Sequence, residues 1–196
     1  MPTPTPAAVT ANPFSWSNMA SYRNGSVPWA QYPTDYCDLF SPIDGPGIHQ
    51  LLVDLAASAR KSVVINMFGW DDPDIDAIVK AKAADPSVYF QMTLDKSQAG
   101  GVHEKELLAG WNSDKIGTSI AIGQSIHHAI SHLKVMIVDG LYVVEGSTNW
   151  SLSGEELQDN QLGIWQNANI AATYRAILDR NHDNCLKQMA HTGGFA

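Results

Sequence analysis

The sequence is poor in charged residues and in cysteine, and it has no long apolar run. Asp, Glu, Lys and Arg make up 16 % of the 196 residues, whereas hydrophobic residues make up 44 %. An average soluble protein has roughly 25 % charged residues, so this composition excludes a highly charged, disordered chain. No stretch approaches the roughly 20 apolar residues that span a bilayer, and we expect no integral membrane segment. The length suits one domain with a packed core.

The two cysteines, Cys37 and Cys185, are too few for a disulfide framework and form no metal-binding pair. Either they bond to each other in an oxidising compartment, or both are buried thiols. The N-terminus has neither the basic segment nor the apolar segment of a signal peptide. The compartment therefore stays open, with the cytoplasm as the default expectation.

Basic residues are fewer than acidic ones, 12 against 20, which gives a net charge of −8. A protein that coats nucleic acid is usually basic, so the balance argues against that class. It leaves open an enzyme that contacts a few phosphates, because the local potential decides such a contact.

The chain divides at about residue 40. Residues 1–40 are rich in Pro, Ser, Thr and scattered aromatics, which favours an extended arm packed across a surface. From residue 41 to 196 apolar residues recur at regular helical or strand spacing, without an internal repeat. We expect helices near 48–60, 73–85, 103–111 and 168–189, and strands over 62–68, 88–94, 118–122, 132–139, 141–145 and 160–165. This order predicts one α/β domain, a mixed β-sheet flanked by helices on both faces.

Four polar side chains are expected to meet where two of these strands lie side by side. His132 and Lys134 share one face of their strand, and Ser147 and Asn149 share a face by the same rule. The turn at residues 139–140 returns the second strand beside the first. An imidazole can act as nucleophile or acid/base near neutral pH, and the other groups supply hydrogen bonds and one positive charge for phosphoryl oxygens.

Taken singly, these residues have ordinary explanations. A His and a Lys two apart in a strand are usually its polar face, and an Asp before Gly is usually a turn residue. The combined spacing is more specific: His-x-Lys, four residues, Asp, six residues, then Gly-Ser-x-Asn. It resembles the HKD signature of the phospholipase D superfamily, carried here by His132, Lys134, Asp139, Gly146, Ser147 and Asn149.

The resemblance implies a mechanism without a metal or other cofactor. One His attacks phosphorus and forms a phosphohistidine, while a His from a second motif protonates the leaving oxygen. This chain carries a single copy of the motif. The small single-motif members of the superfamily, which are bacterial endonucleases, are homodimers with one composite site. The resemblance therefore implies a homodimer in which both copies of His132 face one phosphate.

The resemblance also implies roles for the remaining motif residues. Asp139 has the opposite strand parity to His132, so we interpret Asp139 and Gly146 as structural. In the single-motif endonucleases an acid before the next strand supports the catalytic His; Asp159 is the best candidate here, with Glu155 or Glu156 as substitutes. A metal site at His127, His128 and His132 is not expected, because no Cys or acid stands at ligand spacing.

The substrate class stays open. The length, the single motif and the segment 95–98 favour a nuclease acting on DNA or RNA. The acidic charge favours the alternative, a phospholipase D-type hydrolase or transferase acting on phospholipid or small diesters. A third reading is a dimer that binds nucleic acid without catalysis. Trp70, Trp150 and Trp165 belong either to the core or to a groove beside the site.

Overall fold

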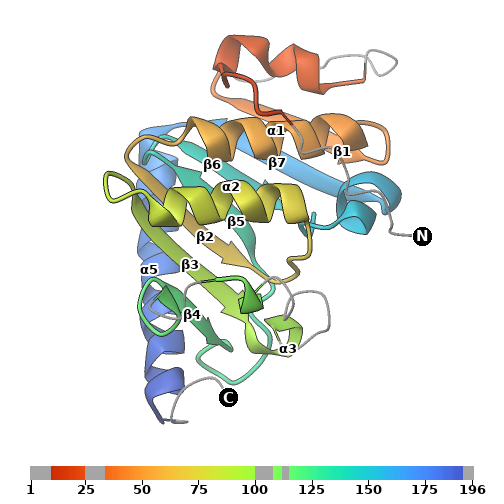
Figure 1. Ribbon diagram of the computed structural model, residues 1–196. Helices are drawn as coiled ribbons and strands as arrows, with labels where there is room; N and C mark the ends of the chain where they lie inside the picture. Colours follow the sequence, from red (N-terminus) through yellow and green to blue (C-terminus); the bar gives the residue numbers. More distant parts are fainter. Residues whose placement is uncertain (1–9, 25–33, 100–107, 112–114, 192–196) are drawn as a thin grey trace, which may run out of the picture.

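The computed structural model describes residues 10–24, 34–99, 108–111 and 115–191. Its centre is a seven-stranded mixed sheet with the order β1-β7-β6-β5-β2-β3-β4 (Figure 1). The strands are β1 (Tyr36–Ser41), β2 (Ser62–Met67), β3 (Tyr89–Asp95), β4 (Ile120–Gly123), β5 (Lys134–Val138), β6 (Tyr142–Gly146) and β7 (Asn160–Gln166). The helical elements are η1 (Trp16–Tyr22), α1 (Gly45–Ser58), α2 (Pro73–Ala84), α3 (Lys96–Ala99), the π-helix η3 (Ser153–Leu157) and α5 (Ala168–His191).

The strand pairing determines which strand ends lie at the edge of the sheet that carries His132 and Lys134. β2, β3 and β4 are parallel, whereas the β2–β5, β5–β6, β6–β7 and β7–β1 pairs are antiparallel. The carboxyl ends of β1, β2, β3, β4 and β6 therefore lie at the same edge as the beginnings of β5 and β7. We call this the carboxyl edge of the sheet.

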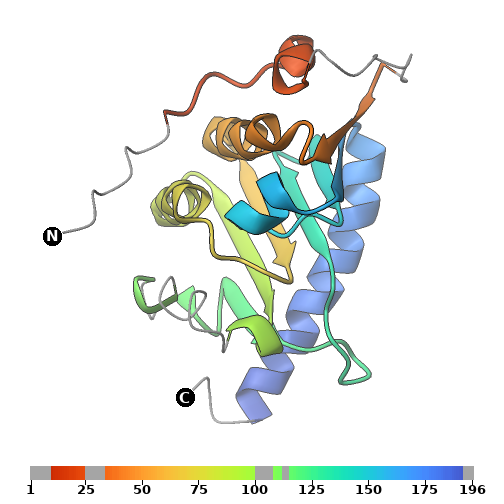
Figure 2. The same ribbon diagram turned by 90° about the vertical axis from the view of Figure 1, so that its right-hand side faces the viewer.

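Helices cover both faces of the sheet, as the sequence predicted. Figure 2 shows α1 and α2 on one side of the sheet and α5 on the other. Alternating strand residues supply the two cores: Met136 and Val138 of β5 pack in the cluster shared with α1 and α2, whereas Val135 and Ile137 pack with α5 residues such as Leu178. Among the described residues no helix is long and apolar enough to cross a membrane.

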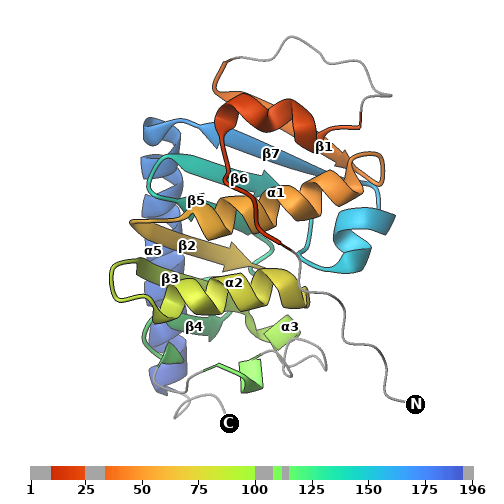
Figure 3. The ribbon, with the colours of Figure 1, turned by 45° about the horizontal axis from the view of Figure 1, so that its top comes forward.

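Residues 10–24 lie across α1 (Figure 3). The Tyr22 hydroxyl donates to Asp54 Oδ2 of α1 at 2.8 Å, and the Phe14 ring lies edge-on to Tyr142 with 5.1 Å between centroids. The indole nitrogen of Trp16 donates to the Thr34 carbonyl at 2.8 Å. These contacts give the aromatics of this segment a packing role.

Two expected boundaries differ from the structure. β1 begins at Tyr36, so the sheet includes an edge strand that the sequence analysis placed in the arm; Leu39 of β1 pairs with Leu162 of β7. β5 begins at Lys134 rather than at His132, because His132 lies beyond the last pair of the ladder, Met67 with Lys134. The helix expected over 103–111 falls mostly outside the described residues.

Cys37 and Cys185 are both free and buried. Burial raises the pKa of each thiol to about 11. Of the two alternatives left open by the sequence, the structure has the buried thiols.

Candidate active site

Two motif side chains, His132 and Lys134, meet at the carboxyl edge of the sheet around the ring of Phe68. The His132 ring packs against Phe68 with 4.6 Å between centroids. The Lys134 ammonium lies 4.8 Å from the centre of the same ring and donates to the His132 carbonyl at 3.0 Å. Phe68 directly follows β2, the strand that pairs with β5, so the sheet register itself brings these three residues together.

Lys134 has an unusual environment for a lysine. It is 4 % exposed, and burial lowers its pKa from 10.5 to about 8. Among the described residues no carboxylate lies within ion-pairing distance of Nζ. A buried cation without a counter-ion is costly unless an anion reaches it, so this site is suited to a negatively charged substrate group.

Asn149 contributes a buried polar atom, its side-chain Oδ1, without a hydrogen-bond partner among the described residues. The amide lies against Gly69, where an added Cβ would come within 3.0 Å of Asn149 Cγ. The next residue, Trp150, donates its N–H to the Gly69 carbonyl at 3.1 Å. The loop after β6 is therefore fastened to the loop after β2, with Asn149 between them.

Ser147 ties β6 to the beginning of β7. Its hydroxyl donates to Asn160 Oδ1 at 2.9 Å and accepts the Gln161 N–H at 3.0 Å. Gly146 precedes it with a φ of 151°, and a Cβ there would lie 2.2 Å from the Gln161 carbonyl oxygen. Glycine is required at that position because the two backbones approach so closely.

Asp139 lies at the opposite edge of the sheet. Its carboxylate accepts the backbone N–H groups of Arg60, Lys61 and Ser62 at 2.7–3.1 Å. Asp139 also has a φ of 55° in the turn between β5 and β6. It fixes the α1–β2 connection against this turn and lies away from His132.

The backbone before His132 is held by an acid that the sequence analysis did not single out as a site residue. Asp95, fully buried at the end of β3, accepts the Ser131 N–H at 2.6 Å through Oδ2. Its other oxygen accepts the N–H and hydroxyl of Ser97. Asn66 of β2 adds a hydrogen bond to the Ser131 hydroxyl at 3.3 Å. Asp95 therefore fixes the backbone of Ser131, and with it the position of His132, which directly follows Ser131.

The sequence-predicted partner of His132 is not in contact with it in this chain. Asp159 is exposed just before β7, and its side chain makes no hydrogen bond or ion pair with the described residues. His132 is also exposed, and its ring likewise bonds to no described side chain. The ring of His132 is thus exposed at the carboxyl edge, with Phe68 as its packing partner.

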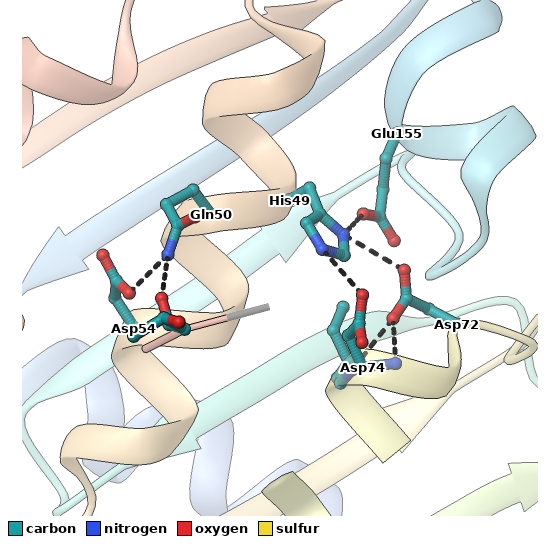
Figure 4. A network of polar contacts seen from close by, with 8 residues as sticks. His49, Gln50, Asp54, Asp72, Asp74 and Glu155 are labelled. Atoms are coloured by element: carbon teal, nitrogen blue, oxygen red, sulfur yellow. Dashed lines mark hydrogen bonds and ion pairs between the residues drawn. The ribbon is translucent and has the colours of Figure 1, made fainter. Parts of the chain in front are cut away.

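A network around His49 was missed by the sequence analysis. His49 Nδ1 lies 2.8 Å from Glu155 Oε2 and 3.1 Å from Asp72 Oδ2, and Nε2 lies 3.6 Å from Asp74 Oδ2 (Figure 4). The hydrogen bonds to Asp72 and Glu155 raise the pKa of His49 to about 10. Burial raises the pKa of Glu155 to about 7, and its Oε1 has no partner among the described residues.

This network joins α1, α2 and η3 next to the loop after β6 that contains Asn149, which we call the Asn149 loop. Asp72 caps α2 by accepting the N–H groups of Asp74 and Ile75, His49 belongs to α1, and Glu155 belongs to η3. The donor atoms of His49, Asp72 and Asp74 lie within 4.8 Å of one another, a spacing that suits a metal ion. At neutral pH the raised pKa of His49 favours an imidazolium, and a metal would first have to displace that proton.

The sequence did not decide whether the tryptophans Trp70, Trp150 and Trp165 belong to the core or to a groove, and in the structure most of them belong to the core. Trp70 and Trp150 are 3 % and 1 % exposed, and their rings pack with 5.0 Å between centroids. Trp165 is half-buried against Tyr36, with 4.1 Å between centroids.

The family model described as "Cardiolipin synthase, PLD-like domain" matches residues 52–182. The chain therefore belongs to the phospholipase D-like family, as the HKD spacing predicted. Membership supports phosphodiester chemistry and a phosphodiesterase-type enzyme. A comparison with curated protein sequences gave no match.

Solved structures share the fold. The phospholipase D family member Nuc from Salmonella typhimurium is 20 % identical with a TM-score of 0.62, covering 76 % of this chain and 94 % of that chain. NucT from Helicobacter pylori is 18 % identical with a TM-score of 0.63, covering 76 % and 96 %. Phosphatidylserine synthase from Haemophilus influenzae Rd KW20 is 12 % identical with a TM-score of 0.55, covering 84 % and 40 %.

Proposed function

We propose that the protein is a metal-independent nuclease that hydrolyses nucleic-acid phosphodiester bonds through a phosphohistidine at His132. The observation that carries the proposal is Lys134, a buried ammonium with no carboxylate partner among the described residues, beside the exposed ring of His132. Lys134 and Asn149 are assigned to the non-bridging phosphoryl oxygens, where charge develops in the transition state. Asp159 is assigned to orienting the His132 ring when substrate is bound.

The reaction has two displacements. A ring nitrogen of His132 attacks phosphorus, and the bond from phosphorus to the leaving oxygen breaks while that oxygen takes a proton from His132 of the partner subunit. Water then gives a proton back to His132 of the partner subunit, and its oxygen attacks phosphorus. The phosphorus–nitrogen bond breaks, which releases the phosphate monoester and restores His132.

The homodimer is part of the proposal because one imidazole cannot stand on both sides of phosphorus. His49 has both ring nitrogens directed at carboxylates, and His182 is buried with its ring bonded to Thr93 and the Thr118 carbonyl. The apolar surface supports pairing at the carboxyl edge. Of the eight exposed large hydrophobic side chains in the described residues, five lie in segments that border this edge: Ile43, Ile126, Ile130, Leu152 and Leu157.

Phospholipid is the second candidate substrate. The same five apolar side chains suit contact with acyl chains, and the net charge of −8 does not favour a polyanion. We rank nucleic acid first because Nuc and NucT match over nearly their whole length, whereas phosphatidylserine synthase matches over 40 % of its length.

The test is a substrate panel in excess EDTA: single-stranded DNA, double-stranded DNA, RNA and phosphatidylcholine vesicles. We expect cleavage of nucleic acid by the wild-type protein and none by His132→Asn. Choline release without nucleic-acid cleavage would favour the lipid candidate. Nucleic-acid binding without cleavage would favour the non-catalytic reading, and activity that returns only with added divalent ions would overturn metal independence.

A further inference from the structure

A second basic site lies beside the candidate active site. A cavity of about 440 Å³ opens between the end of β4, the segment 124–133 and the last turns of α5. Four basic side chains line it, two lysines and two histidines, and among the described residues no acidic side chain is part of the lining. They are Lys96, His128, Lys187 and His191. In a chain of net charge −8, such a grouping marks a local positive potential.

The wall of this cavity is held in place by its own hydrogen bonds. The Gln124 carbonyl accepts from Asn184 Nδ2 and Gln188 Nε2, each at 2.9 Å, and the Gln124 N–H donates to Gln188 Oε1 at 3.0 Å. Gly123 lies so close to α5 that a Cβ there would come within 2.7 Å of Cys185 Sγ. The end of β4 and α5 are thus fixed to each other, and the basic side chains project from a pre-formed frame.

The cavity and the catalytic His132 are joined by one short segment. His128 stands four residues before His132, so their Cα atoms are at most about 14 Å apart. Lys96 directly follows Asp95, whose carboxylate holds Ser131 at 2.6 Å. A separation of this size corresponds to only a few consecutive nucleotides of one strand.

We propose that this cavity binds a backbone phosphate of the substrate strand a few nucleotides away from the bond that is cleaved. The proposal rests on the nuclease function proposed above and assigns Lys96 and Lys187 to that phosphate. Lysine contacts to phosphates position a strand without reading its sequence. The cavity therefore sets where along a strand the scissile bond lies, and short diesters do not reach it.

The test compares two double variants that remove the same charge. Lys96→Gln/Lys187→Gln changes the cavity, whereas Arg60→Gln/Lys61→Gln changes exposed residues at the opposite edge of the sheet. Each pair of changes is placed in the His132→Asn protein. Binding of a labelled single-stranded oligonucleotide in EDTA is then measured by fluorescence anisotropy at a range of KCl concentrations. We expect the cavity variant to bind about tenfold more weakly and its salt slope to fall by about 0.7, since each neutralised phosphate of a single strand contributes about 0.7. The control variant should change far less.

Turnover of bis(p-nitrophenyl) phosphate separates this proposal from the proposed function. The cavity variant with an intact His132 should hydrolyse this small diester at the wild-type rate. Equal weakening of oligonucleotide binding in both double variants, or none in the cavity variant, would overturn the cavity proposal while leaving the nuclease proposal standing. A wild-type protein that neither binds nor cleaves the oligonucleotide refutes the proposed function itself. Loss of binding to phosphatidic acid vesicles alone would reassign the cavity to a lipid headgroup.

Discussion

At the residue scale, Lys134 is the main electrostatic feature of the candidate site. Its Nζ is held by the His132 carbonyl and the face of Phe68, and neither of these contacts neutralises its charge. Burial therefore favours the uncharged amine and lowers the pKa to about 8. A phosphate that arrives at this position supplies the missing negative charge. The lysine that we assign to the phosphate is thus sensitive to pH close to the neutral range.

We predict that kcat/KM for a phosphodiester falls as the pH rises through about 8. Below that pH Lys134 is protonated in the free protein, and above it the ammonium that attracts phosphate is lost. In Lys134→Arg this decline should disappear, because a guanidinium stays charged, although the rate is lower throughout. The measurement is a pH profile of bis(p-nitrophenyl) phosphate hydrolysis from pH 5 to 10. An identical decline in both proteins would show that another group titrates.

The motif residues could be recognised from the sequence, but some of the residues that contact or support them could not. Strand parity and a tight turn, which are local rules, were expected to place His132 beside Lys134 and Asn149 beside Ser147. In the structure His132 precedes β5 and Asn149 follows β6, so parity applies to neither residue. His49 has partners 23 and 106 residues away, Asp72 and Glu155, and such pairs leave no spacing signal in a single sequence. The same holds for Asp95, whose contact with Ser131 spans 36 residues.

At the scale of elements, the His49 network fastens α1, α2 and η3 around the Asn149 loop. The Asp71 and Asp72 N–H groups both donate to the Trp150 carbonyl, at 2.9 and 3.1 Å. Glu155 lies in η3, directly after the same loop, and contacts His49. Movement of His49 would therefore loosen the support of Asn149 without touching the substrate.

We predict that His49→Gln lowers the free energy of unfolding by about 3 kcal/mol near pH 6, because it leaves the buried carboxylates of Asp72 and Glu155 without their partly buried partner. The pKa of His49 is raised from 6.5 to about 10 in the folded protein. Its contribution to stability is therefore complete below pH 6.5 and is lost as the pH rises through 10. Denaturant unfolding at pH 6 and pH 10 should show the gap between wild type and variant shrinking.

The exposed His127 offers a matched control for that experiment. His127→Gln removes a histidine from a loop and should leave the free energy of unfolding within about 0.5 kcal/mol of wild type. A His49→Gln protein as stable as this control at pH 6 would show that the network contributes nothing to the fold.

The fold was predictable where local chemistry is strong. The expected start of a helix at residue 73 is confirmed: Pro73 is the first residue of α2, and Asp72 caps the helix by accepting two backbone N–H groups. β1 was missed because only Cys37 and Leu39 among its apolar residues point into the core, next to a proline-rich region that resembles an arm. Its partner β7 is more than 100 residues away in the sequence, and pairing at that separation depends on the whole sheet.

At the scale of the whole molecule, the proposed mechanism gives one chain half of the groups that an in-line displacement needs. In the proposed mechanism the single HKD motif supplies one nucleophile, and the exposed apolar side chains around the carboxyl edge are the proposed surface for pairing. A C2 dimer repeats the same patch on both subunits, so two copies of His132 would approach each other across the axis.

We predict that excess His132→Asn chains depress the activity of wild-type chains more than simple dilution does. Each mixed dimer retains one His132 and cannot supply both the nucleophile and the proton donor. Sedimentation first establishes the mass, and activity is then measured against mixing ratio after subunit exchange. A fully active species with the 21.3 kDa mass of one chain would refute the composite site and direct the search for the acid to His128.

The most direct test of the central claim is the turnover of bis(p-nitrophenyl) phosphate in excess EDTA by wild type, His132→Asn and the control His127→Asn. Loss of a covalent nucleophile should slow the reaction by at least about 10³-fold, while His127→Asn keeps the wild-type rate and all three proteins unfold at similar temperatures. Turnover at the wild-type rate by folded His132→Asn would contradict the assignment of His132 as the nucleophile.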